Sequence, residues 1–73
     1  MAKKSQTDWE IFKAEVESFI ARTPGMSARR LGKEAVNKTE FVFNMRRGAE
    51  SLPSTVVRVR DWMRAYDDRE SAA

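Results

Sequence analysis

Side chains suited to reading nucleic-acid bases are concentrated in residues 39–47. On a helix, at about 100° per residue, one side of this segment is apolar and the other carries a carboxylate, an aromatic ring, an amide and a guanidinium. The apolar side, which is predicted to pack on a core, consists of Phe41, Val42 and Met45. The opposite side consists of Glu40, Phe43, Asn44 and Arg47, with Thr39 at its edge. Groups of these kinds contact base edges in a major groove.

Each of these side chains has a specific chemistry and a plainer alternative. Asn44 is the leading base-reading candidate, because a planar amide can pair with both N6 and N7 of adenine; the alternative is an ordinary solvent-facing residue. Glu40 either accepts a hydrogen bond from a cytosine amine or neutralises Arg47 or Arg29. Arg47 reaches either a guanine or a phosphate. Phe43 contacts a thymine methyl group, packs against a partner or folds back onto the core.

Positive charge is concentrated in the same region. The net charge is +3, and residues 27–48 carry six basic side chains against two acidic ones, while the flanking segments are nearly balanced. Such a concentration is typical of a surface that binds a polyanion, although it also suits a solvated helix face. Arg46 lies closer to the core flank of its segment and is expected to meet backbone phosphate. The generic phosphate candidates are Arg29, Arg30, Lys33 and Lys38.

The composition excludes several classes of function. The chain has 73 residues with 0 cysteines and 0 histidines, so a disulfide framework, a thiol nucleophile, a zinc finger and a Ser-His-Asp triad are ruled out. No pair of acids has metal ligands or a Gly-rich phosphate loop beside it, so we expect no enzyme, no cofactor, no metal and no small-molecule substrate. No apolar run is long enough for a signal peptide or a membrane span, which favours a cytoplasmic protein without a membrane partner.

Periodicity predicts four helices and no strand, so the expected fold class is a compact all-α domain. The first helix begins at Thr7, where Thr7 to Glu10 has the spacing of a capping box, and it stops before Pro24. Its apolar stripe consists of Trp9, Phe12, Val16, Phe19 and Ile20. Residues 1–6 are polar and basic and are predicted to form a flexible arm.

The unit between Ser27 and Gly48 is predicted to be two short helices joined by a tight turn. Ser27 caps the first, which covers residues 28–36 or ends one residue earlier. Asn37 suits the turn, because asparagine tolerates positive φ. The second helix begins at Lys38 or Thr39, runs to Arg47 and is ended by Gly48.

Gly32 lies in the middle of the first of these two helices, where glycine costs about 1 kcal/mol relative to alanine. Close approach of another helix, which a side chain would block, explains its presence. A neutral glycine on a short helix is the alternative.

A fourth helix is predicted to begin near Ser51 or Ser54, with Pro53 tolerated in its first turn. Its apolar stripe consists of Leu52, Val56, Val59, Met63 and Tyr66, with Trp62 on the flank. Residues 67–73 have no apolar anchor and are predicted to be a loose tail. The folded domain is therefore expected to span residues 7–66.

Residues 25–48 resemble the lambda-repressor-like helix-turn-helix found in phage repressors, Cro proteins and many small bacterial regulators. The residues that lie where this family places small and apolar side chains are Leu31, Gly32, Ala35, Val42 and Met45. The similarity continues through residues 55–63 and covers about residues 7–66. One position differs: the family usually has glycine directly after the first motif helix, whereas this chain has Val36 followed by Asn37.

The resemblance implies a four-helix domain with a helix-turn-helix at residues 27–48, which binds double-stranded DNA sequence-specifically and regulates transcription. Thr39 and Glu40 match early recognition-helix residues that face the groove, and Asn44 matches a later one. A helix start whose backbone amides approach a phosphate is matched by Ser27 and Ala28.

Protein partners are left open by the sequence. Ile11 and Val57 lie off the main apolar stripes and are candidates for a homodimer contact. A regulator of this size is expected to act by occupying or bending DNA, or by contacting RNA polymerase or another regulatory protein. The alternative function is a protein-interaction module in which Phe43 and the basic face dock an acidic partner.

Overall fold

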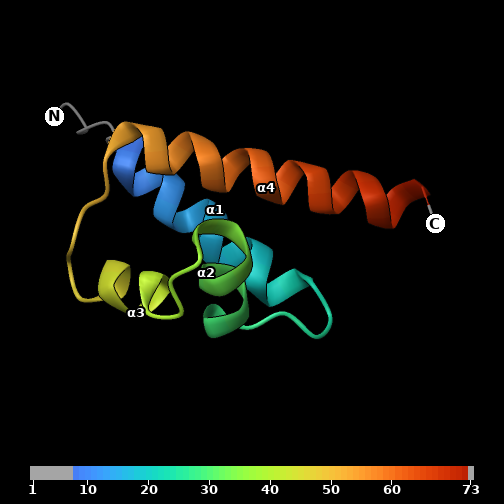
Figure 1. Ribbon diagram of the computed structural model, residues 1–73, viewed down its shortest axis with the longest axis horizontal. Coiled ribbons are helices and arrows are strands. Elements are labelled where there is room, and N and C mark those ends of the chain that lie inside the picture. The colour runs from blue at the N-terminus through green and yellow to red at the C-terminus, as the bar shows by residue number, and fades with distance from the viewer. Residues whose placement is uncertain (1–7, 73) are drawn as a thin grey trace, which may run out of the picture.

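The structure is a computed structural model that describes residues 8–72, and those residues form four helices and no strand (Figure 1). Helix α1 spans Asp8–Arg22, α2 spans Ala28–Val36, α3 spans Phe41–Arg46 and α4 spans Pro53–Ala72. The all-helical class expected from the periodicity is confirmed. The predicted arm at residues 1–6 and the capping residue Thr7 lie outside the described residues.

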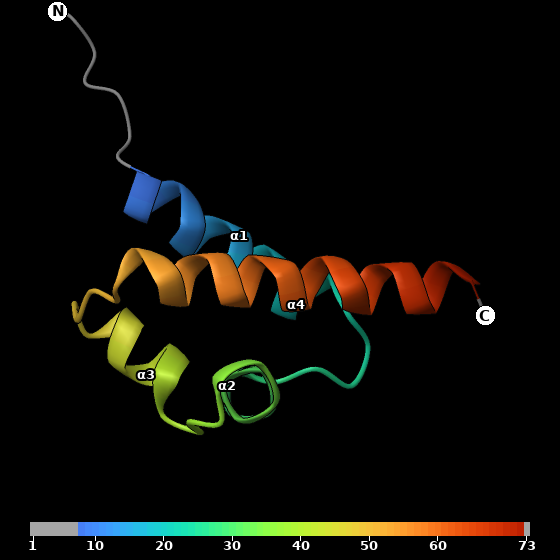
Figure 2. The same ribbon diagram turned by 45° about the horizontal axis from the view of Figure 1, so that its top comes forward.

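The long helix α4 lies beside α1, and the short helices α2 and α3 lie together on one side of this pair, as Figure 1 and Figure 2 show. Helix α2 contacts both α3 and α4. The 20 residues of α4 span about 30 Å at 1.5 Å per residue. Its last turns extend beyond the other helices, which gives extents of 46 × 24 × 21 Å.

One apolar cluster joins the four helices. Three residues of the stripe predicted for α1, Phe12, Val16 and Phe19, are buried in it, whereas Trp9 and Ile20 are partly buried against it. Phe19 packs edge-to-face on Trp62 and Tyr66 of α4, with ring centroids 5.7 and 5.6 Å apart. Aromatic rings prefer this arrangement. Phe12 packs in the same manner on Phe41, at 6.5 Å, so α1 anchors α3 as well as α4.

The turn between α2 and α3 packs directly on α2. Asn37 adopts the predicted left-handed conformation, with φ 58°. Its N–H donates to the Lys33 carbonyl at 3.0 Å, and the Lys38 N–H donates to the Gly32 carbonyl at 2.9 Å. A Cβ at Gly32 would overlap the Lys38 carbonyl oxygen and lie 3.2 Å from Phe41 Cβ. The close approach predicted from Gly32 is therefore confirmed, and the neighbour is the turn together with the first residue of α3.

Helix α3 is shorter than predicted, since it begins at Phe41 rather than at Lys38 or Thr39. The Phe41 N–H donates to the Lys38 carbonyl at 3.1 Å, and the Asn44 N–H donates to the Glu40 carbonyl at 2.9 Å. Because Lys38 is held at the end of α2 by its bond to Gly32, the α-helical ladder starts only after it. Gly48, with φ 108°, follows the helix as predicted.

Helix α4 begins at Pro53. This agrees with the prediction that Pro53 lies in the first turn, where a helix tolerates proline. The inward position predicted for Leu52 is wrong, because this side chain is 71% exposed. Leu52 precedes the helix, and its carbonyl accepts hydrogen bonds from the N–H groups of Thr55 and Val56 at 2.9 and 3.2 Å. Because Leu52 lies before the helix, the helical spacing that places the apolar stripe of α4 on the core does not apply to this residue.

Helix α4 continues through Ala72, whereas the sequence predicts a loose tail from residue 67. Arg22 at the end of α1 donates to both carboxylate oxygens of Asp67, at 3.2 and 2.9 Å. This pair ties the extension to α1 without an apolar anchor. Among the described residues, no helix combines the length and the apolar character needed to cross a membrane.

Candidate nucleic-acid interface

The side of α3 that faces away from the core carries Phe43 and Asn44, and Arg47 follows directly after the helix. All three are exposed, Phe43 to 39%. The buried opposite side consists of Phe41, Val42 and Met45. The two faces expected from the helical spacing are confirmed. Phe43 lies outside the apolar core, which excludes the alternative that its ring folds back onto it.

Asn44 and Arg47 contact each other. Arg47 Nη2 donates a hydrogen bond to Asn44 Oδ1 at 2.7 Å. A guanidinium has donors only, so the atom of the amide that faces Arg47 must be its oxygen. The structure therefore joins two of the residues that the sequence predicts to contact bases.

Thr39 and Glu40 lie in the turn before α3, so the prediction that they belong to the helix is wrong. Thr39 is half-buried. Glu40 is exposed at the N-cap position, where its carboxylate makes no capping hydrogen bond. Within residues 8–72 it forms no ion pair, so the alternative that it neutralises Arg47 or Arg29 is not realised there.

Arg46 is engaged in an ion pair that joins α3 to α1. Its Nε and Nη2 donate to the two carboxylate oxygens of Glu17 at 2.7 and 2.8 Å. This hydrogen bonding lowers the pKa of Glu17 and raises the pKa of Arg46. The same guanidinium lies 5.9 Å from the centroid of the Phe43 ring. A phosphate would have to draw Arg46 away from Glu17 to make the predicted contact.

The start of α2 is held by its own side chains. Ser27 is the N-cap as predicted, since its Oγ accepts a hydrogen bond from the Arg30 N–H at 3.1 Å. The Arg30 guanidinium donates to Glu34 at 2.9 Å and to the Gly25 carbonyl at 3.2 Å, and lies 5.9 Å from the Tyr66 ring. The bond to Glu34 raises the pKa of Arg30. Arg30, a predicted phosphate contact, thus links the preceding loop, α2 and α4.

Three further cations, around α2 and the turn, differ from Arg30 and Arg46 in that they form no ion pair with the described residues. Arg29, Lys33 and Lys38 are exposed, and within residues 8–72 none of them has an ion-pair partner. Arg46 and Arg30 are neutralised by Glu17 and Glu34. The uncompensated positive charge of the central segment therefore comes from these three cations and Arg47.

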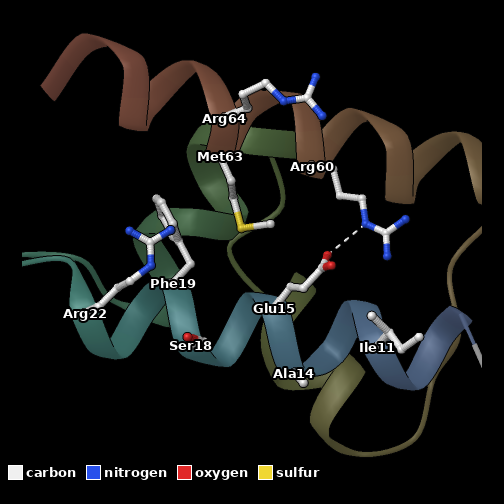
Figure 3. A pocket seen from close by; sticks show the side chains of 9 residues that line it. All are labelled: Ile11, Ala14, Glu15, Ser18, Phe19, Arg22, Arg60, Met63 and Arg64. Atoms are coloured by element: carbon white, nitrogen blue, oxygen red, sulfur yellow. Dashed lines mark hydrogen bonds and ion pairs between the residues drawn. The ribbon is translucent and has the colours of Figure 1, made fainter. Parts of the chain in front are cut away.

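A groove of about 530 Å³ lies elsewhere, between α1 and α4 (Figure 3). Phe19 and Met63 line it, and its charged lining is largely paired within the protein: Arg60 Nε donates to Glu15 at 2.8 Å. This bond raises the pKa of Arg60. In the part of the chain that the structure describes, no three acidic side chains gather as metal ligands.

The two contacts that shape the α3 surface differ in how far the sequence indicates them. Asn44 and Arg47 are three residues apart, a spacing that brings side chains together on a helix, so their hydrogen bond could have been predicted. Arg46 and Glu17 are 29 residues apart, and no local spacing indicates that pair.

Comparisons of this chain with protein-family models, with curated proteins and with solved structures find no significant match. Its function must therefore be inferred from the residues and their geometry.

Proposed function

We propose that this chain is a small sequence-specific DNA-binding protein that regulates transcription, with α2, the turn and α3 acting as a helix-turn-helix. The observation that carries the proposal is the composition of one surface. Asn44 is exposed on α3 and Arg47 is exposed directly after it. The helix α2 and the turn, which pack against α3, carry cations that have no ion-pair partner within residues 8–72. An amide and a guanidinium suit base edges, and cations suit phosphates.

In this proposal the exposed side of α3 enters the major groove while its buried side stays on the core. A major groove is about 12 Å wide and admits an α-helix. The six residues of α3 make fewer than two turns, so only a few side chains can reach base edges. Asn44 and Arg47 are the main candidates, with Phe43 beside them and Glu40 and Thr39 at the leading turn.

The basic side chains divide into two groups. Arg30 and Arg46 chiefly stabilise the fold, because each has a carboxylate partner at 2.9 Å or less. Arg29, Lys33 and Lys38 are exposed and contact phosphates in the complex. Affinity then comes mainly from the release of counterions, which makes it strongly dependent on salt.

Regulation follows from occupying or bending DNA, or from contact with RNA polymerase or another protein. If two copies bind one two-fold symmetric site, its half-sites lie about one helical turn apart.

A titration of fluorescent duplex DNA, followed by anisotropy at several salt concentrations, tests the proposal. With three or four phosphate-contacting cations per chain, the log–log slope of affinity against salt is about −2.7 to −3.6. Lys33→Ala reduces the steepness of this slope by about 0.9. Arg64→Ala is the matched control, because it removes the same charge from an exposed position on α4 beside the α1–α4 groove (Figure 3), and it leaves the slope unchanged.

No binding to duplex DNA at low salt refutes the proposal. That result favours the alternative, in which the exposed Phe43 ring and the neighbouring cations dock an acidic protein.

A further inference from the structure

The hydrogen bond between Arg47 and Asn44 determines which atoms α3 presents to a ligand. Arg47 Nη2 donates to Asn44 Oδ1 at 2.7 Å, and both side chains are exposed. Because a guanidinium carries five N–H donors and no acceptor, this contact fixes the orientation of the amide. One of the two lone pairs of Oδ1 is engaged by Arg47, and the other lies beside the guanidinium charge, which disfavours a further positive donor hydrogen there. Nδ2, with its two hydrogens, is therefore the end of the amide that is better placed for a ligand.

The pair therefore offers hydrogen-bond donors and positive charge. An isolated asparagine offers one acceptor and one donor, which match N6 and N7 of adenine. Guanine instead presents two acceptors, N7 and O6, to the major groove. The guanidinium charge attracts both of these acceptors and repels the amine hydrogens of adenine.

We infer that Asn44 and Arg47 act as one recognition unit that selects guanine, with Asn44 Nδ2 and an Arg47 N–H donating to N7 and O6. This inference rests on the proposed DNA-binding function and differs from the sequence-based expectation that Asn44 reads adenine. Arg47 is then both a base contact and the positioning residue for Asn44.

Selection of bound duplexes from a pool with a randomised core, by the wild type and by Arg47→Met, tests the inference. Methionine keeps a long unbranched side chain but removes the charge and every donor. The wild type enriches guanine at one position, and Arg47→Met enriches adenine there, because the released Oδ1 can accept from N6. On a matched pair of duplexes, the preference between the two bases changes roughly 5- to 150-fold.

Arg64→Met is the matched control, since it removes one charge from an exposed position on α4. It keeps the preference for guanine. A second probe is 7-deazaguanine, which replaces N7 by a C–H group. Its incorporation at the enriched position weakens binding of the wild type and has less effect on Asn44→Ala, which has already lost the amide.

The free protein supplies an independent measurement. The side-chain amide of Asn44 is more ordered on the fast timescale of NMR relaxation in the wild type than in Arg47→Met. Equal mobility in the two proteins overturns the pairing.

The failures of the two ideas are distinguishable. Selection of adenine by the wild type, or selection of the same base by Arg47→Met, overturns the recognition unit and leaves sequence-specific DNA binding intact. Duplex binding without sequence preference overturns the recognition unit and the sequence specificity of the proposed function, and leaves only DNA binding itself. The absence of any duplex binding at low salt overturns both.

Discussion

Replacing Gly32 by alanine tests whether the packing of the turn on α2 sets the position of α3. The added Cβ would overlap the Lys38 carbonyl oxygen and lie 3.2 Å from Phe41 Cβ. The first obstacle is backbone and the second is the root of a buried side chain, so neither can simply rotate away. The turn must shift, which strains the bonds of 2.9 Å from the Lys38 N–H to Gly32 and of 3.1 Å from the Phe41 N–H to Lys38.

Two opposing effects determine how much Gly32→Ala changes the free energy of unfolding. The higher helix propensity of alanine favours the variant by about 1 kcal/mol. Overpacking costs about 1–3 kcal/mol, and a backbone obstacle places this site at the upper end. The expected net loss is about 2 kcal/mol of unfolding free energy. In a domain of this size that loss lowers the Tm by about 8–16 °C.

Thermal and urea unfolding followed by circular dichroism measure this loss, which lowers the urea midpoint without changing the m-value. Lys33→Ala, at an exposed position on the same helix, is the control and stays within about 0.5 kcal/mol of the wild type. If Gly32→Ala is as stable as the wild type, or more stable, helix propensity acts alone and the close-packing argument is refuted.

Three further predictions concern stability and charge. Asn37→Ala lowers stability by about 1 kcal/mol relative to Asn37→Gly, because the residue has φ 58°; equal Tm values contradict this. A double-mutant cycle of Glu17→Gln and Arg46→Met gives a coupling of about 0.5–1 kcal/mol at neutral pH. Since pairing lowers the Glu17 pKa from 4.5, this coupling is present above that ordinary pKa and is lost as the pH falls through the lowered value; a coupling that persists in acid counts against it. Arg30→Ala changes the salt dependence of DNA binding less than Lys33→Ala, because Arg30 is already paired, and an equal change in the two slopes contradicts that role.

Local signals predicted the ends of α2, because each depends on a few neighbouring residues. The Ser27 hydroxyl caps the start through a bond to a backbone N–H three residues on, and Asn37 supplies the left-handed residue at the end. The start of α3 was mispredicted because it depends on tertiary packing: the Gly32 contact holds Lys38 at the end of α2. The exposure of Leu52 was missed because it precedes α4.

The candidate site was partly predictable, because some of its features depend on local spacing and others on contacts between residues far apart in the sequence. Helical spacing alone separates the exposed Phe43 and Asn44 from the buried side of α3. Spacing does not reveal which cations are already paired, since Arg46 finds its partner on α1, far away in sequence. The extension of α4 likewise begins at a long-range pair, between Asp67 and Arg22, that no local spacing indicates.

An NMR titration of the isotope-labelled protein with a selected duplex tests most directly whether α3 contacts DNA. The account predicts that amide shift changes concentrate at the start of α2 and in residues 39–47, with small changes at Ile11 and Arg64 beside the α1–α4 groove. Changes centred on that groove, with α3 unaffected, would contradict it.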